Sequence, residues 1–203
     1  MAVSKEDVIK VDYLLDVDMS TCAENTTFLC ETMKDRSDLH DRSYMERYID
    51  IFMGEVAEKA VINWLNKNGK YAVSAVDKKS GKPDKGHDIF LKDKYGREIK
   101  GSVKSSLSAK KSNIDDILKI FTIATKKSEL RQVNIQVYYW LDIDNKEGHR
   151  TTVPSTDNMA IIGWIGDKDV TDFTTYNKEE RESPKDKKLK DTRTMQSLLD
   201  FLS

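Results

Sequence analysis

The residues best suited to chemistry lie in one stretch, residues 86–106. Asp88 precedes the apolar run 89–91, a charged turn containing glycine follows, and residues 97–106 then alternate in period two. This pattern predicts a β-hairpin whose first strand begins at a carboxylate. One face of the second strand carries Glu98, Lys100, Ser102, Lys104 and Ser106. A carboxylate is thus placed opposite a line of lysines, although strand lysines also occur on ordinary solvated sheet faces.

Acidic side chains without convincing histidine or cysteine partners suit a hard cation that prefers oxygen ligands. Two or three carboxylates can hold Mg²⁺, which activates water and stabilises the charge that develops when a phosphodiester is hydrolysed. A lysine beside the attacking water can assist the same reaction. We interpret His40, His87 and His149 as ordinary polar residues or substrate contacts.

Two more carboxylates lie on a predicted helix. Residues 44–67 have apolar side chains at helical spacing, with a Ser-x-x-Glu capping box before them and an Asn-Gly pair after them. Glu55 and Glu58 are three residues apart and therefore neighbours on this helix. By helical phase Glu58 borders the apolar stripe and Glu55 points away from it, so we expect Glu58 to be the half-buried acid. The alternative is that both are solvent-facing charges.

Together, the hairpin and the helix resemble the PD-(D/E)xK nuclease superfamily. The resemblance rests on Val103-Lys104-Ser105-Ser106 after a strand that begins with aspartate, and on Gly54-Glu55-Val56-Ala57-Glu58 leading to Trp64-Leu65. In that family an aspartate begins one strand, an acid and a lysine two residues apart lie on the next, and a glutamate of the first helix completes the metal site. The resemblance covers roughly residues 44–165 and implies a Mg²⁺-dependent endonuclease, with Mn²⁺ as a substitute, most similar to type II restriction enzymes.

Two registers fit the family pattern. In the first, Asp88 pairs with Ser102-Val103-Lys104; in the second, Asp84 pairs with Glu98-Ile99-Lys100. Both place the acid position fourteen residues after the aspartate, from 88 to 102 and from 84 to 98. We favour the first register because Asp88 leads directly into an apolar strand, whereas Asp84 lies in a loop of Lys, Gly and Pro.

In the favoured register a serine replaces the family acid, so another carboxylate must complete the metal site. A branch of restriction endonucleases has serine there and takes the acid from the following helix, where this chain has Asp115 and Asp116. The resemblance implies the catalytic residues Asp88, Lys104, Glu58, Glu98 and Ser102. The candidate metal ligands are Asp88, Glu58, Glu55, Glu98, Asp115 and Asp116. If no further acid reaches Asp88, the fold is a non-catalytic binding module; a resolvase or repair nuclease is a further alternative.

Double-stranded DNA is the partner that the resemblance implies. We expect its phosphates to contact Lys110, Lys111, Lys126, Lys127 and the lysines between 185 and 190. Each of these lysine runs is also compatible with a plain solvated surface. A two-fold homodimer would match a palindromic site.

Composition limits the alternatives. The chain has 203 residues, 34% of them charged, and a net charge of −1, which excludes a globally basic DNA-coating protein. Two cysteines make neither a disulfide framework nor a zinc site. With no signal peptide or apolar span in the sequence, we expect a cytoplasmic protein without membrane association. We expect one nuclease domain over residues 1–203, with elaborations at 1–43 and 166–203.

The expected fold class is α/β, a mixed sheet flanked by helices, with a restriction-endonuclease-like core in the order α-β-β-β-α-β-β-α. Besides the elements above, we predict helices at 21–33 and 113–129, strands at 71–76, 133–141 and 160–165, and a short closing helix. On the helix at 21–33 we expect Phe28, Leu29 and Met33 to form the apolar side. Residues 3–20 are compatible with a helix or a strand. The charged segment 177–191 predicts a mobile loop or an exposed face.

Overall fold

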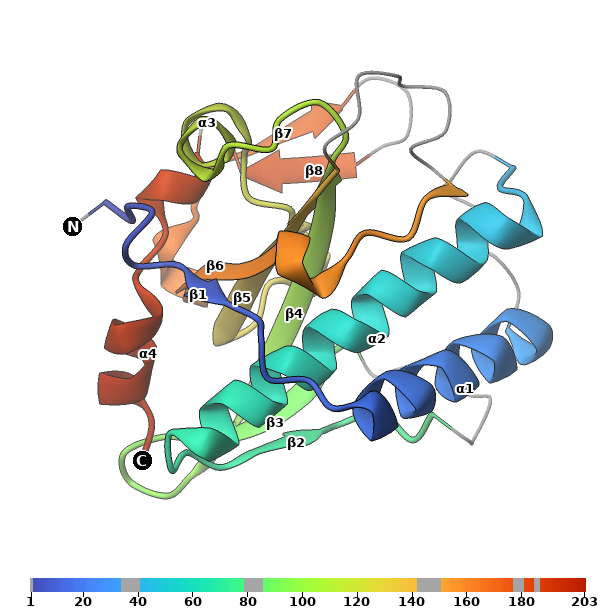
Figure 1. Cartoon of the computed structure of the whole chain (residues 1–203). Coiled ribbons are helices and arrows are strands. Elements are labelled where there is room, and N and C mark those ends of the chain that lie inside the picture. The colour runs from blue at the N-terminus through green and yellow to red at the C-terminus, as the bar shows by residue number, and fades with distance from the viewer. Residues whose placement is uncertain (1, 34–40, 79–85, 142–150, 177–180, 185–186) are drawn as a thin grey trace.

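The computed structural model describes residues 2–33, 41–78, 86–141, 151–176, 181–184 and 187–203 (Figure 1). It has a mixed six-stranded sheet in the order β1-β6-β5-β4-β3-β2. The strands are β1 (Ile9–Lys10), β2 (Ala72–Ser74), β3 (Ile89–Lys92), β4 (Glu98–Ser108), β5 (Val133–Trp140) and β6 (Met159–Ile165). β2, β3 and β4 form an antiparallel meander, and β5 runs parallel to β4. The expected mixed sheet flanked by helices is confirmed.

Helices cover both faces of this sheet (Figure 1). They are α1 (Asp16–Thr32), α2 (Tyr44–Lys67), α3 (Ile114–Ile120) and α4 (Met195–Phe201). The core on one face joins α2 and α4 to the side chains of Ile89, Ile99 and Ile135. The core on the other face joins α3 to Tyr138 and Ile162. Among the described helices, none is long and apolar enough to cross a membrane.

The long helix α2 has the bounds that its sequence predicts because both ends are capped locally. The Ser43 hydroxyl accepts a hydrogen bond from the Glu46 N–H, and the Glu46 carboxylate accepts one from the Ser43 N–H. Gly69, with φ of +72°, follows the C-terminal cap in a left-handed conformation. These caps fix where α2 begins and ends, and so the positions of Glu55 and Glu58.

The N-terminal region differs from the expectation. Residues 3–20 contain the short strand β1 and the start of α1, which begins before residue 21. The buried residues of α1 are Cys22, Thr26 and Cys30, rather than Phe28, Leu29 and Met33, which are only partly buried. Residues spaced by four lie on one helix face, and the face of α1 that is buried carries these small side chains.

Two further predictions were wrong in part, and they concern two segments that contact each other. The helix predicted at 113–129 ends at Ile120, because residues 121–123 are extended and hydrogen-bond with residues 187–189. The segment 177–191, predicted as a mobile loop or an exposed face, contains β8 (Arg181–Pro184), which pairs with β7 (Phe173–Tyr176), and a short 3₁₀ turn with the fully buried Leu189. Leu189 fills the core beneath α3.

Candidate functional site

Asp88 immediately precedes β3, at the point where the paired strand β4 extends beyond the end of β3. The last paired residues are Ile89 and Gly101, and the Asp88 N–H donates to the Gly101 carbonyl at 3.0 Å. The Asp88 Oδ2 accepts hydrogen bonds from the Ser102 hydroxyl at 2.8 Å and from the Val103 N–H at 2.7 Å. The structure therefore brings Asp88 and Ser102 together, as the favoured register predicts, and holds the carboxylate in one orientation.

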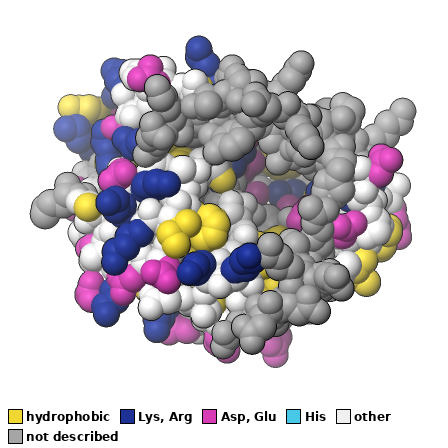
Figure 2. All heavy atoms as spheres, turned by 90° about the horizontal axis from the view of Figure 1, so that it is seen from above, with side chains coloured by type: hydrophobic (Ala, Val, Ile, Leu, Met, Phe, Trp, Pro, Cys, Tyr) yellow, Lys and Arg dark blue, Asp and Glu magenta, His cyan; other side chains and the backbone are white. Residues whose placement is uncertain are grey.

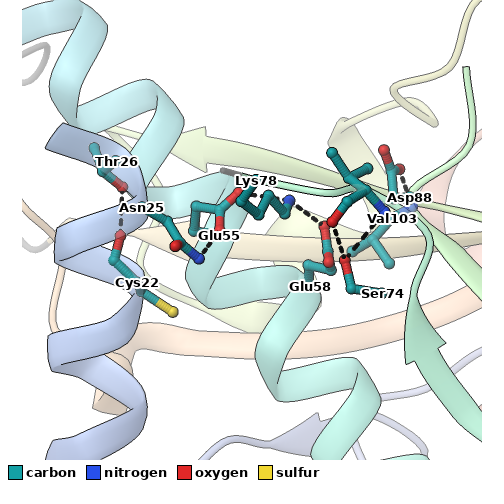
Figure 3. Close-up of polar contacts among 10 residues, drawn as sticks. Cys22, Asn25, Thr26, Glu55, Glu58, Ser74, Lys78, Asp88 and Val103 are labelled. Carbon is teal, nitrogen blue, oxygen red and sulfur yellow. Dashed lines mark hydrogen bonds and ion pairs between the residues drawn. The ribbon is translucent and has the colours of Figure 1, made fainter. Parts of the chain in front are cut away.

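Glu55 and Glu58 of α2 converge on Lys78, which follows β2 (Figure 3). The Lys78 Nζ lies 2.7 Å from Glu55 Oε1 and 2.9 Å from Glu58 Oε2. Asn25 of α1 donates to the other oxygen of Glu55 at 3.1 Å, and the Ser74 hydroxyl hydrogen-bonds Glu58. Glu55 is as buried as Glu58, contrary to the helical-phase expectation, because α1 packs over that side of α2.

The ionisation of this cluster follows from its burial. Burial raises the pKa of Glu58, although Lys78 and Ser74 favour its charged form. Burial by itself lowers the pKa of Lys78, but Glu58 and Glu55 outweigh it and raise that pKa to about 12. Lys78 therefore stays protonated as the counter-ion of the two glutamates.

The glutamate cluster and Asp88 are neighbours through β2. Ser74 pairs with Ile89, and the next residue, Ala75, donates its N–H to the Asp88 carbonyl at 2.8 Å. The fit to Mg²⁺ is partial: two carboxylates converge on a cationic nitrogen, and oxygen donors of this kind suit that ion. Within the part of the chain that the structure describes, no three His, Cys, Asp or Glu side chains gather as a metal site.

Lys104 lies across the sheet from these glutamates. Val103 packs toward the α2 core. Successive side chains of a strand point to opposite faces, so Lys104 points to the α3 face. There the Lys104 Nζ contacts Glu129 Oε2 at 3.0 Å. No local sequence signal indicates the contact of Glu129 with Lys104 or of Lys78 with the glutamates, because these partners are distant along the chain and only the topology brings them close.

The other candidate acids lie elsewhere. Glu98 is exposed at the hairpin end of β4, opposite Lys92 and four residues from Ser102. Asp116 contacts Lys111 at 3.8 Å, and Asp115 lies beside it in the first turn of α3. In the alternative register, Lys100 is exposed opposite Phe90, and Asp84 lies outside the described residues.

The candidate DNA-binding lysines lie around α3. Lys110, Lys111 and Lys127 are exposed and Lys126 is half-buried. The pairing of residues 121–123 with 187–189 brings Lys187 and Lys188 to the same region, whereas residue 185 lies outside the described residues. In Figure 2 many Lys and Arg side chains gather on the left half of the face, the side of α3 in Figure 1. A hollow right of centre contains both acidic and basic side chains.

Comparison with known proteins found no match among family models, curated proteins or solved structures. The geometry of the chain itself is therefore the basis for a functional proposal.

Proposed function

We propose that this protein is a Mg²⁺-dependent DNA endonuclease with a PD-(D/E)xK-like core. One observation carries the proposal: Asp88 is fixed at the start of β3 beside β2, and β2 also carries Ser74, which hydrogen-bonds Glu58 of the buried glutamate pair. Buried acids held this way are costly in a protein that has no use for them.

The order and pairing of the elements support the proposal. A long helix bearing acids precedes a three-stranded meander, and a crossover containing α3 leads to β5, which is parallel to β4. The resemblance predicts a helix, three strands, a helix and a further strand in this order.

Glu55 and Glu58 would hold Mg²⁺, and the ion would supply an activated water and charge stabilisation. The chain's own residues prepare the site. Ser102 and Val103 both bind Oδ2 of Asp88, and among the described residues Oδ1 has no hydrogen-bond partner. That oxygen is available to a ligand while the other keeps the carboxylate in place.

A second candidate is a non-catalytic nucleic-acid-binding module. It is favoured by Lys78, which neutralises much of the charge of the two glutamates, and by Ser102 in the position of the family acid. The lysines around α3 would serve either function.

Incubating the purified protein with long unmethylated duplex DNA, in Mg²⁺ and in EDTA, tests the proposal. Discrete Mg²⁺-dependent bands support a sequence-specific endonuclease, and a smear supports a less selective one. A branched DNA junction, run in parallel, detects a resolvase. A salt-sensitive mobility shift without cleavage of any substrate would replace the nuclease proposal with the binding module.

Two variants connect any cleavage to the site. Asp88→Asn should reduce cleavage at least about a hundredfold, the usual scale for losing a group that organises the reaction. Asp12→Asn is the matched control, because it makes the same substitution at an exposed position outside the proposed site. Equal activity of the two variants would remove Asp88 from the proposed site.

A further inference from the structure

A second charged cluster lies on the α3 face of the sheet. Lys104 comes from β4, and Lys126 and Glu129 come from the segment between α3 and β5. The Glu129 carboxylate lies between the two lysines, at 3.0 Å from Lys104 Nζ and 3.9 Å from Lys126 Nζ. One anion thus faces two cations, and all three side chains are partly open to solvent, between 23% and 32% exposed.

Two buried polar groups adjoin this cluster. Gln136 is the cross-strand partner of Lys104, and its Oε1 accepts a hydrogen bond from the Ala124 N–H at 3.1 Å. The Gln136 Nε2 and the hydroxyl of the next residue after Ala124, Thr125, are buried without a hydrogen-bond partner among the described residues. The two residues are only 2% and 4% exposed. Leaving a buried donor unpaired destabilises a protein, so these groups point to a ligand that accepts hydrogen bonds.

We propose that Lys104, Lys126, Thr125 and Gln136 form a subsite for one phosphate group of a nucleic-acid backbone, and that Glu129 takes its place when no ligand is bound. Every group assigned to the ligand can donate a hydrogen bond, and two are cations, which together match a phosphate. The choice of nucleic acid over a free phosphate rests on the proposed function and on the lysines beside α3.

Glu129 then controls this subsite. With its carboxylate between the lysines, only an anion that competes for both cations can enter. Removing that charge should tighten binding of duplex DNA on the order of tenfold, through the lost repulsion and the released lysines. Removing the Thr125 hydroxyl should weaken binding without harming the fold, because that hydroxyl makes no hydrogen bond to any residue that the structure describes.

The experiment measures binding of a short fluorescent duplex by anisotropy, in EDTA, so that its outcome does not depend on cleavage. Glu129→Gln is compared with Asp116→Asn, which removes the same charge from the same face beside Lys111. The proposal expects tighter binding for Glu129→Gln than for Asp116→Asn. Equal tightening by both would show general electrostatics and would overturn it.

A second pair of variants tests the buried groups. Thr125→Val should weaken duplex binding severalfold with an unchanged or higher Tm. Thr192→Val is its control, because the buried Thr192 hydroxyl donates to the Leu189 carbonyl at 2.8 Å; it should lower Tm and leave binding unchanged. Undiminished binding by Thr125→Val contradicts the subsite.

Inorganic phosphate distinguishes the source of the anion. If phosphate raises the Tm of Glu129→Gln and competes with the duplex, a backbone phosphate is supported. If phosphate raises that Tm while neither Glu129→Gln nor Thr125→Val changes duplex affinity, the nucleic-acid assignment is overturned.

Discussion

Replacing Lys78 with methionine tests the glutamate cluster most directly. The substitution keeps the length of the side chain and removes the counter-ion of two carboxylates that are only 9% and 11% exposed. Removing one partner of a buried ion pair costs about 3–5 kcal/mol, and the lower end applies because Lys78 lies at the rim of the cluster, with its side chain 15% exposed. For a chain of this size, about 3 kcal/mol corresponds to a fall in Tm of roughly 6–12 °C.

The destabilisation should depend on pH, with a sign set by Glu58. Its pKa is raised in the folded state, so the folded state binds a proton more readily than the unfolded state does. Such a group stabilises the fold below its ordinary pKa, and that contribution is lost as pH rises through the folded-state pKa. Without Lys78 the pKa of Glu58 should rise further, so the deficit of the variant should shrink in mildly acidic buffer.

Urea denaturation at neutral and mildly acidic pH provides the assay, with Lys59→Met as the matched control. Lys59 lies beside Glu58 on α2 and pairs with Asp18 at 3.0 Å, but its side chain is 37% exposed, so we expect its loss to cost less than about 1 kcal/mol. The double variant Lys78→Met with Glu58→Gln should recover part of the stability. A Lys78→Met deficit no larger than that of Lys59→Met, or one that grows toward acid pH, would refute this account.

Two glycines should respond in opposite ways to alanine, as thermal unfolding would reveal. Gly54→Ala should raise stability by up to about 1 kcal/mol, because Gly54 lies inside α2 and a methyl group there meets nothing within 4 Å. Gly163→Ala should lower the free energy of unfolding by about 1–3 kcal/mol, because the added methyl group would lie 2.4 Å from the Arg193 carbonyl. Unchanged stability would show that the backbone around Arg193 can move to accommodate the methyl group. Asp93→Asn should lower Tm at neutral pH, because hydrogen bonds from Arg97 hold the pKa of Asp93 below its ordinary value. That contribution is present above the ordinary pKa and is lost as pH falls, so the Tm difference should close in acid, and a constant difference would contradict it.

Much of the fold follows from local signals in the sequence. The caps of α2 and the period-two alternation of β4 depend on residues a few positions apart, and both elements match their predicted ranges closely. The helix at 113–129 was predicted too long because its apolar spacing continues past Ile120, and the competing contact comes from residues 187–189. Such a contact leaves no trace in a local window.

Some features of the candidate site also follow from local sequence, and others depend on the tertiary fold. Asp88 and Ser102 meet because the hairpin register follows from the turn, which the sequence contains. The burial of Glu55 depends on the place of α1, which the phase of α2 alone does not indicate. The separation of Lys104 from Glu58 depends on which face of the sheet α2 covers, and this is a property of the topology.

The contact between residues 121–123 and 187–189 also has a consequence for the order of folding. The Val3 N–H donates to the Lys190 carbonyl at 2.7 Å, so the N-terminal segment, residues 187–190 and the crossover after α3 meet at one place. Contacts between segments so far apart in sequence form slowly, because a long loop must close first. During synthesis the crossover is translated well before residues 187–189, which hold it in place. We therefore expect the crossover to be the last segment on the surface of the sheet to become protected from hydrogen exchange.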